Sequence, residues 1–156
     1  MIRRATPADA AAVLDCLREA FEPYRAQYTP DGFADTVLSP QTLAHRMATM
    51  TVFVAVDAAE QVIGTIACHR SSEREGHLRG MAVLSSAQGQ GIAAALIRAA
   101  EAELFGSGCE RITLDTTKVL HRAMRFYESQ GYARTGVISD FFGMELIEWA
   151  KSLDQR

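Results

Sequence analysis

Apolar residues recur along the chain with two periods, and their order predicts a mixture of strands and helices. Between residues 9 and 22 they return every three or four positions, as on the buried face of a helix, and Pro23 is expected to end that helix. Thr6 is expected to cap its start, because the following Pro7 suits a first helical turn. Residues 2–4 are predicted to form a short strand.

Two β-branched runs, 51–56 and 62–68, flank a short polar segment and predict a β-hairpin. The region before it is less regular. Residues 22–40 contain three prolines and one glycine, so they are expected to form a loop with room for one helical turn. A helix is predicted over residues 41–50.

The second half of the chain alternates strands and helices. A glycine pair at 106 and 108 allows the left-handed backbone that commonly ends a helix, and marks the end of the first helix in this half. The predicted elements are a strand at 77–84, a helix from the glycines at 89–91 to 104, a strand at 111–115, a helix at 119–130, and strands at 132–136 and 144–149.

Length and composition are those of one globular domain, expected to span residues 1–156. Hydrophobic residues make up 48% of the chain and charged residues 22%, so a buried core is expected. The net charge is −3 and the basic residues are scattered, which argues against a nucleic-acid partner because no dense basic face is formed.

Cysteine usage and hydropathy bear on the location of the protein. Cys16, Cys68 and Cys109 are odd in number and lack metal-ligand spacing, which favours free buried thiols in a reducing compartment and predicts no metal site. The first residues have no apolar signal core, and no apolar run approaches the roughly 20 residues that span a bilayer. We therefore expect a cytoplasmic protein without a membrane role.

The glycine segment before the predicted helix at 89–104 is the strongest chemical signal. The first four N–H groups of a helix have no partner within it, and the helix dipole adds about half a positive charge at that end, so an anion is favoured there. Gly89, Gly91 and Ala93 remove side chains that would hold a phosphate away from the backbone. The segment therefore predicts a diphosphate site, although two glycines before a helix often do no more than shape a turn.

A dinucleotide fingerprint is the nearest alternative, because Gly89, Gly91 and Ala94 fit G-x-G-x-x-A and Asp115 lies about 20 residues further on. In a dinucleotide fold the first glycine follows the strand directly, whereas residues 84–88 intervene here. A hairpin-first order also differs from repeated βαβ units. We therefore reject this alternative.

Two motifs in order resemble the GCN5-related N-acetyltransferase (GNAT) family. Residues 88–93 read QGQGIA and match the motif Q/R-x-x-G-x-G/A, and residues 80–83 resemble the family's fourth strand. Residues 123–132 read AMRFYESQGY and are similar to the family's second signature, A-x-x-F-Y-E-x-x-G-F. The chain departs from the family pattern at two positions. Leu120 stands where asparagine is frequent, so one side-chain hydrogen bond to the cofactor is not expected. Ser85 stands where proline is frequent, which affects only the rigidity of the loop.

The resemblance implies an α/β fold with a mixed, mostly antiparallel sheet flanked by helices. It implies that acetyl-CoA enters between the strands at 77–84 and 111–115, where its pantetheine arm pairs with strand backbone like an added strand. The residues expected to bind the cofactor are Met81, Ala82, Val83, Gln88, Gly89, Gln90, Gly91, Ile92 and Ala93.

Two side chains are candidates for proton transfer. Tyr127 matches the family tyrosine near the thioester sulfur, where a phenol can protonate a departing thiolate, although a core position would show the same pattern. His77 is the candidate base, and strand alternation predicts that it shares a face with Val83. Alternative bases are Glu75, His69, Asp115 or a water chain. The Val83 backbone N–H is a candidate oxyanion donor.

The expected activity is direct transfer of the acetyl group of acetyl-CoA to an amine of a small molecule or peptide. By resemblance, aromatic residues at 21–33 and 141–142 would wall the acceptor pocket, and exposed apolar strands near the C-terminus favour a homodimer. Two alternatives remain: a non-catalytic acyl-CoA sensor or regulatory module, and a domain that binds only protein partners. Fold alone does not decide the acceptor.

Overall fold

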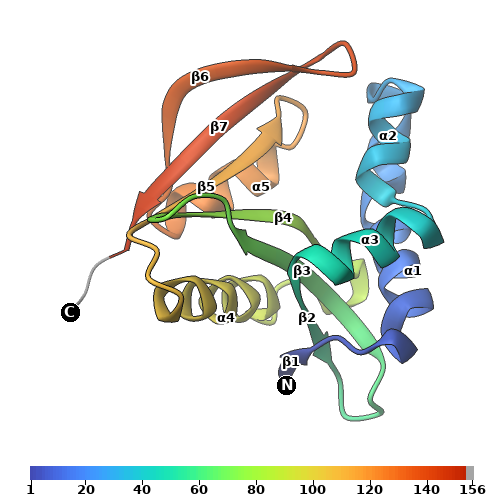
Figure 1. The fold of residues 1–156 in the computed structure, drawn as a ribbon. Coiled ribbons are helices and arrows are strands. Elements are labelled where there is room, and N and C mark those ends of the chain that lie inside the picture. Colours follow the sequence, from blue (N-terminus) through green and yellow to red (C-terminus); the bar gives the residue numbers. More distant parts are fainter. Residues whose placement is uncertain (154–156) are drawn as a thin grey trace.

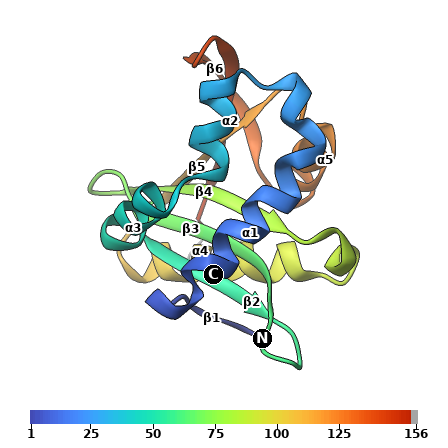
Figure 2. The same ribbon diagram turned by 90° about the vertical axis from the view of Figure 1, so that its right-hand side faces the viewer.

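The computed structural model describes residues 1–153, in which a seven-stranded sheet is covered by helices on both faces (Figures 1 and 2). The strand order is β1-β2-β3-β4-β5-β7-β6, and every neighbouring pair is antiparallel except β4 and β5. The predicted mixed, mostly antiparallel sheet is therefore confirmed. The strands are β1 (Ile2–Arg4), β2 (Thr51–Val56), β3 (Val62–Arg70), β4 (Glu75–Val83), β5 (Arg111–Thr117), β6 (Ala133–Phe141) and β7 (Met144–Ser152).

Five α-helices flank the sheet within residues 1–153. They are α1 (Ala10–Phe21), α2 (Pro30–Val37), α3 (Pro40–Thr49), α4 (Ile92–Gly106) and α5 (His121–Ser129). Short 3₁₀ helices lie at Pro7–Asp9, Glu22–Gln27 and Ser85–Ala87. In this part of the chain, no helix combines the length and the apolar character needed to cross a lipid bilayer.

Two hydrophobic cores hold the helices against opposite faces of the sheet. On one face, α4 packs its buried residues, among them Leu96, Ile97 and Leu104, against β3, β4 and β5. On the other face, α1 and α3 pack on β2 and β4, with Leu17 and Leu43 almost fully buried. Both faces of the central strands are thus covered, which explains the nearly continuous apolar run of β2.

The loop predicted for residues 22–40 is wrong, because this region contains a 3₁₀ helix and the two-turn helix α2. Thr29 caps α2 by accepting a hydrogen bond from the Gly32 N–H at 3.1 Å, and Pro30 occupies the first helical position. Gly32 does not break the helix. A Cβ at this position would lie 2.8 Å from Thr29 Oγ1, so this glycine allows close packing instead.

Hydrogen bonds to the Asp9 carboxylate fix the segment that leads into α1. Thr6 is the N-cap of the 3₁₀ helix Pro7–Asp9 that leads into α1. The Asp9 carboxylate accepts hydrogen bonds from the Thr6 N–H at 2.7 Å and from two Arg3 nitrogens at 2.8 and 3.0 Å. The Arg3 side chain, followed by the Thr6 N–H, holds the pKa of Asp9 well below its usual range.

Asp9→Asn is expected to lower the free energy of unfolding at pH 7 by about 1 kcal/mol, because a neutral amide replaces the carboxylate that accepts charge-assisted hydrogen bonds from Arg3. Because the pKa of Asp9 is depressed by folding, the carboxylate stabilises the fold above the unfolded-state pKa of about 4 and stops doing so as pH falls further. Denaturant unfolding of both proteins at pH 7 and pH 3 measures this. If the free energies of unfolding of the two proteins differed by the same amount at both pH values, the stabilising role assigned to the Asp9 carboxylate would be contradicted.

Candidate active site

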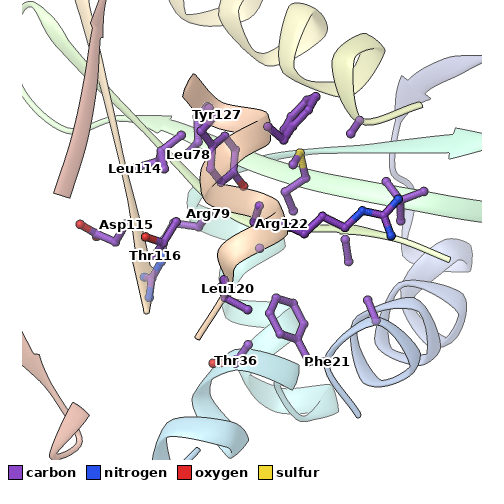
Figure 3. A pocket seen from close by; sticks show the side chains of 18 of the residues that line it. Phe21, Thr36, Leu78, Arg79, Leu114, Asp115, Thr116, Leu120, Arg122 and Tyr127 are labelled. Atoms are coloured by element: carbon purple, nitrogen blue, oxygen red, sulfur yellow. The ribbon is translucent and has the colours of Figure 1, made fainter. Parts of the chain in front are cut away.

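A cavity of about 500 Å³ opens where β4 and β5 separate (Figure 3). The two strands pair over only three positions, from Glu75 with Arg111 to His77 with Thr113. Beyond that point β4 stays paired with β3, whereas β5 continues along β7 as far as Thr117 opposite Leu146. Backbone groups of β4 after His77 therefore have no partner strand on the β5 side, as the resemblance implied.

Side-chain hydrogen bonds hold the free half of β5 away from β4. The Trp149 indole N–H donates to Thr116 Oγ1 at 2.9 Å, and the Tyr28 hydroxyl lies 3.0 Å from Thr117 Oγ1. All four side chains are buried. The opening is therefore part of the packed structure.

A β-bulge at Gly80 changes which side chains of β4 face the cavity. Thr65 and Ala67 of β3 are two residues apart, but their partners Ala82 and Arg79 are three apart. The extra residue sits at Gly80, whose φ of 60° is readily adopted only by glycine. The ladder is thus interrupted beside the point where β4 leaves β5.

The predicted shared face of His77 and Val83 is wrong because of this bulge. Before it, Leu78 packs on the α4 side and His77 faces the opposite side; after it, Val83 packs on the α4 side and Ala82 on the α1 side. A period of two therefore fails between residues 77 and 83. The alternation in the sequence gives no sign of the extra residue.

The loop before α4 and the first turn of that helix line the cavity. Gly89 and Gly91 have φ values of 80° and 76°, and a Cβ at either position would meet no atom within 4 Å. Gly91 is the N-cap of α4 and supplies no side-chain cap. Among the hydrogen bonds of residues 1–153, none is donated by the backbone N–H groups of residues 89–94. This end of α4 is the uncapped helix terminus that favours an anion.

Side chains on either side fix this loop. Gln88 Oε1 accepts a hydrogen bond from Arg122 at 2.5 Å, which brings a guanidinium of α5 to the mouth of the loop. Ser85 donates its hydroxyl to the Glu19 carboxylate of α1 at 2.8 Å. The serine that replaces the frequent proline is therefore anchored by α1. Leu120, which replaces the frequent asparagine, lines the cavity.

Tyr127 projects from α5 and lines the cavity (Figure 3). Its ring packs at the edge of the α4 core and contacts the rings of Phe126 and Tyr132. Within the described chain no group hydrogen-bonds to its hydroxyl. Burial raises the pKa of the Tyr127 phenol above its ordinary value, so the hydroxyl is protonated at neutral pH.

His77 lines the cavity from β4, held by residues of β5. Its Nδ1 lies 2.7 Å from Thr113 Oγ1, and its Nε2 lies 3.4 Å from an Asp115 carboxylate oxygen. Asp115 also lines the cavity. The imidazole and the carboxylate thus border the cavity together, an arrangement that suits proton transfer.

The other proposed bases lie in different surroundings. Arg111 donates to the Glu75 carboxylate at 2.6 Å, and Glu75 does not line the cavity. His69 stacks edge-on against His77, with ring centroids 6.0 Å apart, but also lies outside the lining. Desolvation lowers the pKa of His69. Of these alternatives, only Asp115 borders the cavity.

The three cysteines are buried and free. Burial raises the pKa values of Cys16 and Cys68 to about 12, and also raises the pKa of Cys109. The prediction of buried thiols is therefore confirmed. A thiol with so high a pKa is a poor nucleophile at neutral pH, which disfavours a covalent acetyl-enzyme.

The structure brings ten of the eleven predicted site residues to one cavity. Both proton-transfer candidates line it, as do all the predicted cofactor-binding residues except Gln90, which is exposed. Sequence reasoning missed Arg46 and Arg122, which also line it. Arg122 adjoins the second signature, but Arg46 lies far from either motif.

Comparison with known proteins agrees with this geometry. A model of the Acetyltransferase (GNAT) family matches residues 12–132, most of the chain. The chain belongs to this family.

Two curated N-acetyltransferases match part of the chain. N-alpha-acetyltransferase 30 of Schizosaccharomyces pombe is 34% identical over 86 residues, covering 53% of this chain and 57% of that protein. Human N-acetyltransferase 8B is 28% identical over 124 residues, covering 76% of this chain and 52% of that protein. The chain thus spans little more than half the length of these relatives.

Solved GNAT structures match the fold over nearly the full chain. The PaiA N-acetyltransferase of Thermoplasma acidophilum, solved in complex with coenzyme A, superposes with a TM-score of 0.81 at 17% identity, covering 98% of each chain. Identity at this level shows a shared fold. It confirms the fold expected from the two motifs.

Proposed function

We propose that this protein is an acetyl-CoA-dependent N-acetyltransferase that moves the acetyl group directly to an amine of a small molecule or peptide. The observation that carries the proposal is one continuous cavity with free backbone N–H groups at residues 89–94 and unpaired β4 backbone beyond His77. Family membership and the names of both curated relatives support the reaction type.

The donor would be held by backbone more than by side chains. The N–H groups of residues 89–94 would bind the diphosphate, with Arg122 adding a cation at the same mouth. The backbone of residues 81–83 would pair with the pantetheine amides. Gln88 would bind indirectly, by positioning Arg122. Bound acetyl-CoA would supply a thioester whose acetyl carbon is open to attack by a neutral amine.

Proton transfer would be divided between two side chains. His77, beside Asp115, would accept the proton that the amine loses as its nitrogen bonds to the acetyl carbon. Tyr127 would donate its proton to the sulfur as the carbon–sulfur bond breaks, since its raised pKa keeps the phenol protonated. The backbone N–H of Val83 would stabilise the oxyanion between these events.

Thiol release from acetyl-CoA tests the proposal. The chain is incubated with acetyl-CoA and a panel of amines, and free coenzyme A is measured while calorimetry measures donor binding. Release that requires both donor and amine is expected. Binding without release from any amine would favour the non-catalytic sensor, and no binding at all would leave only a fold resemblance.

His77→Gln is expected to lower kcat about 100-fold with the best amine, the loss typical for a general base. The affinity for acetyl-CoA should stay within about twofold, because His77 lies away from the glycine loop. His69→Gln is the matched control, since His69 neighbours His77 without lining the cavity. Full activity in His77→Gln would assign the base to water or Asp115, and an equal loss in His69→Gln would mean that the effect is not specific to His77.

Three further expectations remain proposals. The single-domain organisation agrees with the continuous sheet of residues 1–153. A reducing, cytoplasmic location is supported by the three free thiols. A homodimer is supported by exposed apolar side chains on β6, where Val137 and Ile138 are 52% and 50% exposed.

A further inference from the structure

The cavity contains an arginine that neither motif explains. Arg46 extends from α3 to the bulge of β4, where its guanidinium lies so close to Gly80 that a Cβ at that position would collide with it. It is partly buried and lines the cavity. Within residues 1–153 it has no ion-pair or hydrogen-bond partner.

Neighbouring charges do not neutralise Arg46. Asp35 of α2 lies 3.8 Å from the Arg79 guanidinium of β4, and Asp115 lies 3.4 Å from His77. The two arginines and Asp35 together leave one positive charge unmatched. Burial, and then the charge of Arg79, lower the pKa of Arg46 to about 10, so it is still charged at neutral pH.

A partly desolvated cation without a partner is unfavourable until an anion neutralises it. A guanidinium is suited to a carboxylate, because its planar donors form two parallel hydrogen bonds with the two oxygens. The unmatched charge at Gly80 therefore points to a carboxylate on a ligand. The phosphates of the donor are expected at the other end of the cavity, at residues 89–94.

The position of Arg46 relative to the proposed base sets the geometry of that ligand. His77 and Arg79 lie on the same face of β4 before the bulge, about 7 Å apart along the strand. Arg46 adjoins the next residue, Gly80. An amine facing His77 can thus belong to the same small molecule as a carboxylate at Arg46. Aromatic rings of Phe21 and Tyr24 line the same cavity.

We propose that the acceptor is a small primary amine bearing a carboxylate, an amino-acid-like molecule, and that Arg46 binds the carboxylate. This assignment rests on the proposed N-acetyltransferase function and deepens it. Arg46 thereby selects acidic acceptors, while the amine is directed toward His77. Neutral amines of the same shape lack the group that Arg46 binds.

The test uses the full chain, acetyl-CoA and a panel of amino acids that differ in the spacing between amine and carboxylate. Each amino acid is paired with its own carboxamide, for example L-phenylalanine with L-phenylalaninamide, and thiol release gives kcat and KM for each. For the best pair, the acid is expected to have at least about tenfold higher kcat/KM than the amide, as loss of a charge-assisted hydrogen bond implies. Arg46→Gln should abolish that preference by raising KM for the acid alone.

Controls separate this role from general damage. Arg46→Lys keeps the positive charge but loses the planar guanidinium that donates two parallel hydrogen bonds. It should retain part of the preference for the acid over the amide. Arg98→Gln removes an exposed arginine of α4 outside the cavity and should change nothing. Calorimetry should give the same acetyl-CoA affinity for all variants. Titration of the best acid into protein saturated with coenzyme A should show binding that Arg46→Gln loses.

The possible failures are distinguishable. Equal kcat/KM for acids and carboxamides in wild type overturns the proposed acceptor class and leaves the N-acetyltransferase function standing. An equal loss with acids and amides in Arg46→Gln assigns Arg46 to the donor or to catalysis and also overturns the inference. Donor binding without thiol release from any acid or amide overturns the acceptor class; it overturns the proposed function as well only when the wider amine panel also gives no release.

Discussion

Gly91→Val is expected to weaken acetyl-CoA binding about 100-fold. Gly91 is the N-cap of α4 with a φ of 76°, a conformation that is costly for a β-branched residue. The added side chain would also enter the space in front of the free N–H groups at residues 89–94. Losing one or two charge-assisted hydrogen bonds accounts for a change of this size. Isothermal titration calorimetry measures the dissociation constant directly.

Gly108→Val is the matched control for backbone strain. Gly108 follows α4 at its other end, has a φ of 94° and also has open space where a Cβ would lie. It does not line the cavity. Both variants should lose comparable stability to heat, but only Gly91→Val should lose donor affinity. Unchanged affinity in Gly91→Val would mean that the diphosphate binds elsewhere.

Tyr127→Phe is expected to reduce kcat between about 100-fold and 1000-fold while acetyl-CoA affinity changes less than about twofold. The hydroxyl faces the cavity without a hydrogen-bond partner in residues 1–153, so its loss leaves no polar group buried and unpaired. The apolar ring, which supplies the packing, is kept. Steady-state kinetics on the best amine, together with calorimetry, separate turnover from binding.

Tyr132→Phe is the control, because Tyr132 contacts the Tyr127 ring but donates its hydroxyl to Glu101 at 2.8 Å outside the cavity. It is expected to cost some stability and little turnover. Full activity in Tyr127→Phe would remove the phenol from the reaction and leave protonation of the sulfur to water.

The elements with strong local signals were predictable. The β-branched hairpin of β2 and β3, the glycine-bounded α4 and the strand β5 lie close to their predicted ranges, because periodicity and glycine placement act locally. For α2, the same local rules predicted a loop where the structure has a helix. Pro30 and Gly32 favour a loop in isolation, but Thr29 caps the helix and the missing side chain of Gly32 serves tertiary packing.

The parts of the site that backbone forms were predictable from the sequence. The side chains that reach the site from distant elements were less predictable. The glycine loop and Tyr127 lie within contiguous motifs. The bulge at Gly80 depends on the register with β3, which single-strand alternation cannot reveal. Arg46 reaches the cavity only because α3 packs on the sheet beside β4. Its proposed role rests on its lack of an ion-pair or hydrogen-bond partner within residues 1–153, which the sequence does not reveal.

Backbone amide NMR tests the central claim, that the free N–H groups before and within the first turn of α4 hold the diphosphate. The labelled chain is titrated with coenzyme A and, in parallel, with pantetheine, which has no phosphates. Coenzyme A should shift the amide signals of residues 89–94, pantetheine should leave them in place, and both should shift those of residues 81–83. Tight binding of coenzyme A with the signals of residues 89–94 unmoved would contradict the claim.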